Sequence, residues 1–552
     1  MLHFFTRIYD IFRSFSRTER NVFIASASTG VVALFLGIGF LFGSVTEVVP
    51  ISGGEHTEGI VGQPAFVNPV LAASEADKGL VRFFFNNLAD LAETVQSSKE
   101  GRVWTVRLKE NILWHDGKKL TSDDVIFTVE KIQDPDSRSP LFLAWQGVLA
   151  QRMSEQEIQF NLGVPYAFFE ANLQNLYILP EHIFADVPVA NWRISEFNLK
   201  PVGSGPYRFL SYDVQPNGFV TAYHLVAHTE YVHGAPLIPT LTIRFFSAKD
   251  ALIDAFNAGR VDGVGGLVEQ DLGAVQRPFE IVRFPVPSYY AVFLNQNQHL
   301  ALKELAVRNA LDAALNKMEL VERVFGGNAL PAFGPIPAHA PYFEMTFLHT
   351  SSSPAAEELL ERAGWHKGPD GIRAKQMRDA TIALEFTLTV PEVPFLTATA
   401  EYLKAAWEAA GARVTLETRP LANLTETAIK NRDYQMLLFG NILNSSLDLF
   451  SFWHSSERFY PGMNLALYNN TKADGLIESI RNAGDEETRT EQFKEIQRLI
   501  HDEYPAIFLY TPDHLYIARK GLKGVVPRML GEAADRFLGV AAWHLKTARV
   551  LK

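Results

Sequence analysis

The sequence predicts an α/β protein made of two lobes that follow one transmembrane helix. Three observations lead to this class. Residues 21–43 carry no charge, regions 239–266 and 380–441 alternate strand and helix patterns, and extended segments at 279–297 and 503–525 lie at the transitions. The chain has 552 residues, which is enough for two or more hydrophobic cores. A chain that passes twice between two β/α units predicts two lobes joined by a hinge.

The N-terminal segment has the charge asymmetry of a membrane anchor. Four arginines precede residues 21–43, whereas no lysine or arginine follows until Lys78. A helix rising about 1.5 Å per residue crosses a hydrocarbon core of about 30 Å over this length. We therefore expect a cytoplasmic tail (1–20), an uncleaved anchor (21–43) and a linker (44–56), with the rest of the chain extracytoplasmic. A cleavable signal peptide is the alternative interpretation.

Composition excludes several functional classes. The net charge of −11 provides no basic footprint, so we expect no nucleic-acid partner. The absence of cysteine excludes disulfides, cysteine nucleophiles and iron–sulfur clusters. The 15 histidines form no HExxH motif, and no set of nucleophile, base and oxyanion donor can be recognised. We therefore predict no cofactor, no metal site and no enzymatic activity.

Each β-α-β region has its own periodicity. Residues 239–246 alternate as a strand, and 247–260 follow as a helix with Ser247 as the expected N-cap. In the second region, 380–390 alternates with a period of two and 395–411 has helical spacing. The pattern then continues as strand, short helix and strand at 412–419, 424–432 and 433–441. Successive units of this kind predict a mostly parallel sheet, which binds ligands outside the carboxyl ends of its strands.

The stretch KPVGSGPYRFLSYD, residues 200–213, places three small residues between two prolines. A phosphate loop would need Gly-x-x-x-x-Gly-Lys-Ser/Thr, and a nucleophile elbow would need Gly-x-Ser-x-Gly; neither pattern fits. We expect a tight structural corner in which Gly203 and Gly205 permit positive φ angles, Pro206 fixes its own φ, and Tyr207 starts a strand.

The acidic stretch around His115 could suggest a metal site, but a turn and a helix cap explain it better. Asp116 and Gly117 form a turn dipeptide. Thr121 or Ser122 is placed to cap a helix whose first turn carries two aspartates, which the helix dipole favours.

The loop 439–454, FGNILNSSLDLFSFWH, is where we expect ligand contacts. It follows the last strand of the second β-α-β region and is rich in Asn and Ser, whose side chains both donate and accept hydrogen bonds. A connection without ligand contact is the alternative. The candidate residues in this loop are Phe439, Asn441, Asn444, Asp448 and Trp453.

Further candidates lie outside this loop. Tyr289, Tyr290 and Asn295 belong to the first crossing segment, and Trp145 lies in SPLFLAWQGV, residues 139–148. Aromatic side chains at a hinge can stack on a ligand, but they can equally pack the hinge itself.

Six stretches resemble, in the same order, those of the extracellular solute-binding proteins of ABC importers, family 5, the peptide/nickel-binding class. The resemblance covers roughly residues 57–545 and includes an HDG turn before a capped helix and a PVGTGPY-like corner. The stretches are FVNPVLAASEADKGLVRFFFNNL (66–88), WTVRLKENILWHDGKKLTSDDVIFTVEKIQDP (104–135), PVGSGPYRF (201–209), LIDAFNAGRVDG (252–263), VRNALDAALNKMELVERVFGGNALPAFGPIP (307–337) and EELLERAGWHKGPDG (357–371).

The resemblance implies a type II periplasmic-binding-protein-like fold with an extra subdomain in lobe I. It also implies a monomeric protein at the cell membrane that delivers a ligand, with oligopeptides as our first choice, to the permease subunits of an ABC transporter. The implied boundaries are 57–287 for lobe I with its subdomain at about 89–199, 288–509 for lobe II, and 510–552 for the return to lobe I.

One departure from the family bears on the ligand. In peptide-binding members the loop that starts here at residue 439 begins with Trp and carries an Asp that pairs with the ligand's α-ammonium group. In this sequence Phe439 takes the Trp position, the Asp position falls near Asn441 and Ile442, and Asp448 is the only acid in the loop. This leaves open an N-blocked peptide, an unrelated solute, or a peptide held by other acids. Two more interpretations stay open: a nickel or metal-chelate ligand, and a sensing or chaperone clamp without transport.

Overall fold

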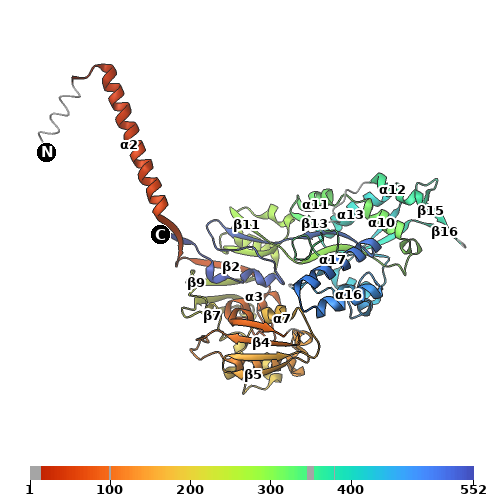
Figure 1. Cartoon of the computed structure of the whole chain (residues 1–552), viewed down its shortest axis with the longest axis horizontal. Coiled ribbons are helices and arrows are strands. Elements are labelled where there is room, and N and C mark those ends of the chain that lie inside the picture. Colours follow the sequence, from red (N-terminus) through yellow and green to blue (C-terminus); the bar gives the residue numbers. More distant parts are fainter. Residues whose placement is uncertain (1–13, 99–100, 345–352, 378–379, 445) are drawn as a thin grey trace. The chain divides into compact units, whose positions relative to one another are not determined.

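The computed structural model describes residues 14–98, 101–344, 353–377, 380–444 and 446–552 (Figure 1). The chain divides into two compact units. Unit 1 contains the segment up to Gly54 together with His544–Lys552, and unit 2 is Glu55–Trp543.

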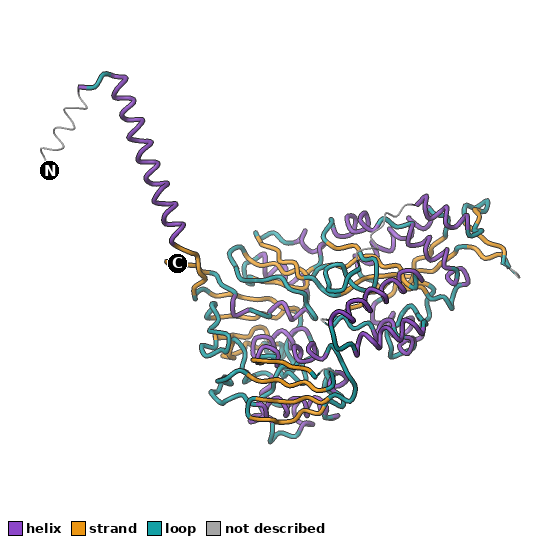
Figure 2. The backbone as a smooth tube through the Cα atoms, in the orientation of Figure 1, coloured by secondary structure: helices purple, strands orange, loops and turns teal. Residues whose placement is uncertain are grey.

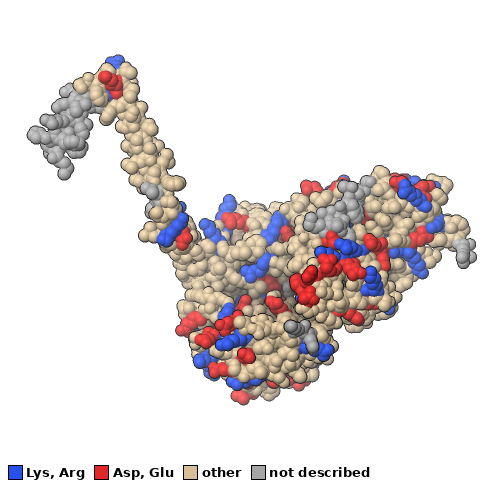
Figure 3. Space-filling model, viewed as in Figure 1, with Lys and Arg blue, Asp and Glu red and all other residues tan. Residues whose placement is uncertain are grey.

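Unit 1 consists of one long helix and a two-stranded sheet. The helix predicted over 21–43 is present as α2 (Arg17–Val45), and Ser16 caps it by accepting the Glu19 N–H at 3.3 Å. An 18-residue window within residues 17–38 has a mean hydropathy of 1.9, and a helix of this length and composition can cross a membrane or act as a signal sequence. In Figure 3 its middle carries no charged side chain. Within the predicted linker, β1 (Thr46–Ile51) pairs antiparallel with β22 (Lys546–Leu551).

Lobe I of unit 2 is built on a seven-stranded sheet. Strand β2 lies between β9 and β10 and runs parallel to both, as the β-α-β pattern predicts. Helix α9 (Lys249–Asn257) connects β9 to β10, but its N-cap is Ala248 without a side-chain hydrogen bond, so the predicted Ser247 cap is wrong. The strand order is β11 (Phe279–Phe284), β21 (His514–Arg519), β10 (Gly263–Leu267), β2 (Glu55–Val61), β9 (Thr240–Phe246), β8 (Val220–Ala227) and β7 (Tyr207–Val214).

A subdomain is inserted between β2 and β7 of lobe I. Its antiparallel sheet has the order β3 (Ala92–Ser97), β4 (Val103–Leu108), β6 (Glu157–Asn161) and β5 (Leu149–Ser154), and Figure 1 shows β4 and β5 in a layer separate from β2 and β9. The predicted Thr121 cap is confirmed, since its hydroxyl accepts the Asp123 N–H at 3.3 Å. The helices between β2 and β7 are α3 (Glu75–Phe84), α4 (Leu88–Leu91), α5 (Ser122–Gln133), α6 (Phe142–Trp145), α7 (Phe169–Asn175) and α8 (Glu181–Phe184).

Lobe II is built on a six-stranded mixed sheet. Strand β17 pairs in parallel with β18 and β19, which confirms the second β-α-β pattern. The other three strand pairs of this sheet are antiparallel, so the predicted mostly parallel sheet is wrong. The predicted strand 380–390 is divided, because Thr381–Ala383 (β16) joins a small separate sheet with β14 (His366–Lys367) and β15 (Arg373–Gln376). The main order is β13 (Ala329–Pro331), β20 (Ala506–Pro512), β12 (Ser288–Leu294), β19 (Met436–Ile442), β17 (Glu385–Pro391) and β18 (Arg413–Arg419).

Helices cover both faces of the lobe II sheet (Figure 2). One face packs against Leu403 and Trp407, and the other packs against Ile477 and Phe493. The helices of this lobe are α10 (Leu305–Ala313), α11 (Lys317–Phe325), α12 (Ser353–Arg362), α13 (Pro394–Ala409), α14 (Leu421–Leu424), α15 (Phe450–Trp453), α16 (Thr471–Asn482) and α17 (Glu486–Glu503).

Two short straps connect the lobes. The first strap, residues 285–287, joins β11 of lobe I to β12 of lobe II; the second strap is Asp513, between β20 and β21. Strand β12 begins at Ser288 and β21 at His514, and the predicted lobe boundaries at 288 and 510 stay a prediction.

The predicted Gly-Ser-Gly corner is present before β7, but the reason why it needs glycine differs from the one we expected. Neither Gly203 nor Gly205 has a positive φ, so the corner does not use the backbone conformation that these glycines permit. A Cβ atom on Gly203 would lie 1.8 Å from the Phe84 carbonyl oxygen, and one on Gly205 would lie 2.7 Å from the Phe83 carbonyl oxygen. Glycine is required here because the corner lies directly against the backbone of α3.

His115 of the HDG turn holds this corner. Its Nδ1 accepts the Gly203 N–H at 3.1 Å, and its Nε2 lies 3.0 Å from the Gly205 carbonyl, to which the neutral tautomer donates. Burial lowers the pKa of His115 to about 3, against the opposing hydrogen bond to Gly205.

We expect acid to destabilise the fold partly through His115. Because its folded-state pKa is lowered, the unfolded chain binds the proton more readily, and stability falls as pH drops from about 6.5 towards about 3, by up to about 1.4 kcal/mol per pH unit. Urea unfolding at pH 7, 5.5 and 4.5 measures this slope. His115→Gln, which cannot titrate, is expected to show a shallower slope; an equal slope in both proteins would contradict this assignment.

Candidate functional site: a cleft between the two lobes

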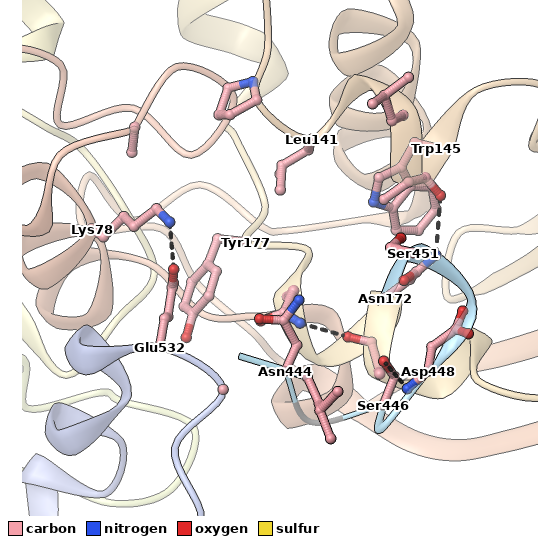
Figure 4. A pocket seen from close by; sticks show the side chains of 18 of the residues that line it. Lys78, Leu141, Trp145, Asn172, Tyr177, Asn444, Ser446, Asp448, Ser451 and Glu532 are labelled. Carbon is pink, nitrogen blue, oxygen red and sulfur yellow. Dashed lines mark hydrogen bonds and ion pairs between the residues drawn. The ribbon is translucent and has the colours of Figure 1, made fainter. Parts of the chain in front are cut away.

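A cavity of about 660 Å³ lies between the two lobes and is called the cleft pocket (Figure 4). Lobe I and its subdomain form one wall, loop 443–452 and α16 of lobe II form the other, and Gly531 and Glu532 close it from the return segment. Its lining includes the side chains of Lys78, Arg82, Trp145, Tyr166, Asn172, Tyr177, Asn444, Asp448, Arg481 and Glu532.

A cluster of paired charges forms the lobe I wall. Helix α3 presents Lys78 and Arg82 one turn apart, and both make ion pairs with Glu532. Arg82 also binds Asp535 at 2.9 Å and lies 4.3 Å above the Tyr177 ring. Burial would raise the pKa of Glu532, but the two cations outweigh it and the pKa is lowered. The cluster therefore fastens the return segment to α3 and leaves little net charge on this wall.

The acid of the lobe II wall is also paired. Asp448 accepts the Phe450 N–H at 3.0 Å and the Tyr166 hydroxyl at 3.3 Å, and it lies 3.1 Å from the Arg481 Nε. Arg481 in turn covers the Phe450 ring at 4.4 Å. Burial raises the pKa of Tyr166, and the adjacent Asp448 carboxylate adds to this, so the hydroxyl stays a donor. Asp448 thus has three partners from the protein itself.

Three consecutive residues of the subdomain contact lobe II beside the pocket, and we call them the closure segment (166–168). Besides the Tyr166 hydrogen bond, the Ala167 N–H donates to the Arg481 carbonyl at 2.7 Å. Phe168 is 6% exposed and belongs to a hydrophobic cluster that otherwise consists of lobe II residues. Its ring lies 6.4 Å from that of Phe493. These contacts join the two lobes across the cleft.

Three of the predicted site residues line the cleft pocket. Asn444 and Asp448 approach it from lobe II, and Trp145 approaches it from α6 of the subdomain. Trp145 is 1% exposed and packs against Phe160 and Phe169, so most of its indole is buried in the subdomain beneath the pocket surface.

Three other predicted residues, Tyr290, Phe439 and Asn441, line a second cavity of about 370 Å³ beside the two straps, called the strap pocket. The loop 439–452 runs from one cavity to the other, since Ile442 lines the strap pocket and Leu443 lines the cleft pocket. Two consecutive residues of this loop therefore line different cavities.

The remaining predicted residues, Tyr289, Asn295 and Trp453, are absent from both linings. The Tyr289 hydroxyl accepts hydrogen bonds from Asn441 at 2.9 Å and from Trp453 at 3.0 Å inside the lobe II core. Asn295 donates to the Arg432 carbonyl at 3.0 Å. These contacts position the loop and its strand, and the predicted ligand contacts of all nine residues stay a prediction.

Sequence reasoning missed the lobe I wall. Lys78 and Arg82 have the spacing of one helix face, which the sequence shows, but their partner Glu532 lies 454 and 450 residues away from them in the sequence. The closure segment gave no signal at all, because two aromatic residues after a proline are equally typical of a local core.

Known proteins share both the sequence pattern and the architecture of this chain. The family model for bacterial extracellular solute-binding proteins, family 5 (middle region), matches residues 88–458. The oligopeptide-binding protein AppA of Bacillus subtilis is 25% identical over 502 residues, which cover 86% of this chain and 89% of AppA. The structure of AppA in complex with a nonapeptide covers 90% of this chain and 100% of its own, with a TM-score of 0.66.

Two further structures share the fold. CtaP, an ABC transporter substrate-binding protein from Listeria monocytogenes, has a TM-score of 0.76 at 23% identity and covers 90% of this chain and 99% of its own. NikZ from Campylobacter jejuni, solved in complex with Ni(L-His), has a TM-score of 0.69 at 23% identity and covers 89% and 99%. The shared fold is the α/β type II periplasmic-binding-protein fold. Because the family model matches more than half of its length, the chain belongs to the bacterial extracellular solute-binding proteins, family 5.

Proposed function

We propose that this protein is a membrane-tethered receptor that binds oligopeptides in the cleft pocket and presents them to an ABC permease. One observation carries the proposal: both lobes wall the cleft pocket, and the acids on each wall are paired with cations of the same protein. The walls therefore offer amides such as Asn172 and Asn444, which suit the backbone of an extended peptide. The relatedness to AppA supports the same choice.

The mechanism follows from the two straps and the closure segment. A ligand that contacts both walls favours the form in which the lobes meet, so binding shifts the population from open to closed. Contacts made mostly to the peptide backbone give broad sequence selectivity. We infer that α2 stays uncleaved and tethers a monomer to the membrane, which raises its local concentration near a permease.

Native mass spectrometry of the full chain released from detergent tests the proposal. We expect mass increments that correspond to copurifying peptides, or to peptides added from a library. Retention of Ni²⁺ without a peptide would contradict peptide binding and favour a metal-chelate ligand, for which NikZ is the precedent. An empty protein that no peptide library shifts would favour a sensing or chaperone clamp.

A further inference from the structure

The strap pocket is mainly apolar. Phe325, Phe395, Leu396 and Phe439 contribute hydrophobic surface from lobe II, and Val286 of the first strap adds to it. Gly266, Leu267 and Val268 close the pocket from the end of β10 in lobe I. Both straps and both lobes therefore contribute to this cavity, so its shape changes whenever the lobes move.

One carboxylate lies in this apolar lining. Asp513, the second strap, lines the pocket, and no residue in the described part of the chain hydrogen-bonds to or forms an ion pair with its carboxylate. The cation that acts on it electrostatically, Arg283, is already committed to Glu269 through two contacts of 2.9 and 3.0 Å. The acids of the cleft pocket are all paired, so Asp513 differs from them.

The surroundings of Asp513 make its negative charge costly. Burial raises its pKa, and Glu269 raises it further against the opposing effect of Arg283. The neighbouring His514 does not neutralise it, because burial, reinforced by Arg536, lowers the pKa of His514 to about 3 and keeps the imidazole uncharged at neutral pH. A cation from outside the protein would stabilise this carboxylate.

We propose that Asp513 binds the ammonium group of the ligand and that the apolar wall of the strap pocket takes the side chain next to it. The ligand class is thus a peptide with a free N-terminus and an aliphatic or aromatic first residue; this rests on the proposed function and names the substrate class of the same cleft. The remainder of the peptide follows the loop from Ile442 to Leu443 into the cleft pocket.

The position of Asp513 explains how the loop can lack its own acid. Strand β12 pairs with β19 on one side and β20 on the other, so the ends of β19, at Ile442, and β20, at Pro512, flank the start of β12. Two strand spacings amount to about 10 Å. A carboxylate that follows β20 can therefore line the same cavity as a residue at the end of β19.

Isothermal titration calorimetry on the full chain in detergent tests this assignment. The probes are pentapeptides that begin with Phe, the same peptides N-acetylated, and N-acetylated peptides that begin with Lys. Wild type is expected to bind the free-amine peptides at least about tenfold more tightly than the acetylated ones. Asp513→Asn is expected to remove this difference in affinity. Glu280→Gln, which removes an exposed charge from β11, the strand paired with β21, is expected to retain the difference.

The outcomes separate the two proposals. Wild-type binding of a peptide with equal affinity for both N-termini, or a preference that persists in Asp513→Asn, overturns the role of Asp513 and leaves peptide binding intact. Recovery of affinity by the lysine probe in wild type but not in Asp513→Asn would assign the carboxylate to a side-chain ammonium in place of the α-ammonium. Absence of any peptide binding by wild type overturns the proposed function and this inference with it.

Discussion

Replacing Phe168 by alanine is expected to weaken ligand binding by about 10- to 100-fold while the unliganded protein stays folded. Phe168 belongs to the subdomain, yet it is buried against Phe493 of lobe II. Truncating a buried phenylalanine costs about 3 kcal/mol or more. We expect part of that cost to fall on the closed form alone, because separating the lobes would break this contact. The apparent affinity falls with the population of the closed form, about tenfold for each 1.4 kcal/mol.

Calorimetry with a peptide identified by mass spectrometry measures this effect. Phe459→Ala is the matched control, because this phenylalanine lies on lobe II but is 66% exposed. The affinity of the Phe459→Ala variant for the peptide is expected to equal that of wild type. If Phe168→Ala bound as tightly as Phe459→Ala, the closure segment would have no role in closing the cleft.

The second large effect is expected from Gly203→Ala, which should destabilise lobe I by more than about 3 kcal/mol. The added methyl group would lie 1.8 Å from the Phe84 carbonyl oxygen, and since this neighbour is backbone, either the corner or α3 must move. The same movement would disturb His115, whose imidazole binds Gly203 and Gly205.

Urea unfolding of Gly203→Ala and Gly273→Ala compares the two situations. Gly273 has no atom within 4 Å of its would-be Cβ and does not have a positive φ, so its substitution should be close to neutral. Equal unfolding midpoints for the two variants would show that the corner is looser than the structure indicates.

Local patterns in the sequence were sufficient for the β-α-β units. The second half of the alternating stretch 380–390 and the helical spacing over 395–411 correspond to β17 and α13, because one strand face and one helix face are each buried in a single core. The corner at Gly203 was recognised for the wrong reason. A positive φ and a close approach both require glycine, and sequence alone does not separate them.

The cleft could not be predicted in the same way, because its walls join residues that are distant in sequence. Tyr289 and Tyr290 show the difficulty: adjacent residues of β12 point to opposite faces, and Tyr289 packs in the core with Trp453 while Tyr290 packs with Phe395 and lines the strap pocket. Nothing in the local pattern indicates which face meets a cavity. Asp513 could not be recognised from the sequence either, since only the tertiary structure shows that its carboxylate has no hydrogen-bond or ion-pair partner among the described residues.

Closure of the two lobes around a ligand can be measured directly. Because the chain contains no cysteine, two spin labels can be placed without background, at Leu210→Cys on β7 of lobe I and Met318→Cys on α11 of lobe II, both exposed positions. Pulsed electron–electron double resonance then measures the distance between them. A saturating peptide is expected to shift the distribution to a shorter and narrower distance, and Phe168→Ala should reduce that shift. An unchanged distribution in a protein that calorimetry shows to be saturated would contradict closure.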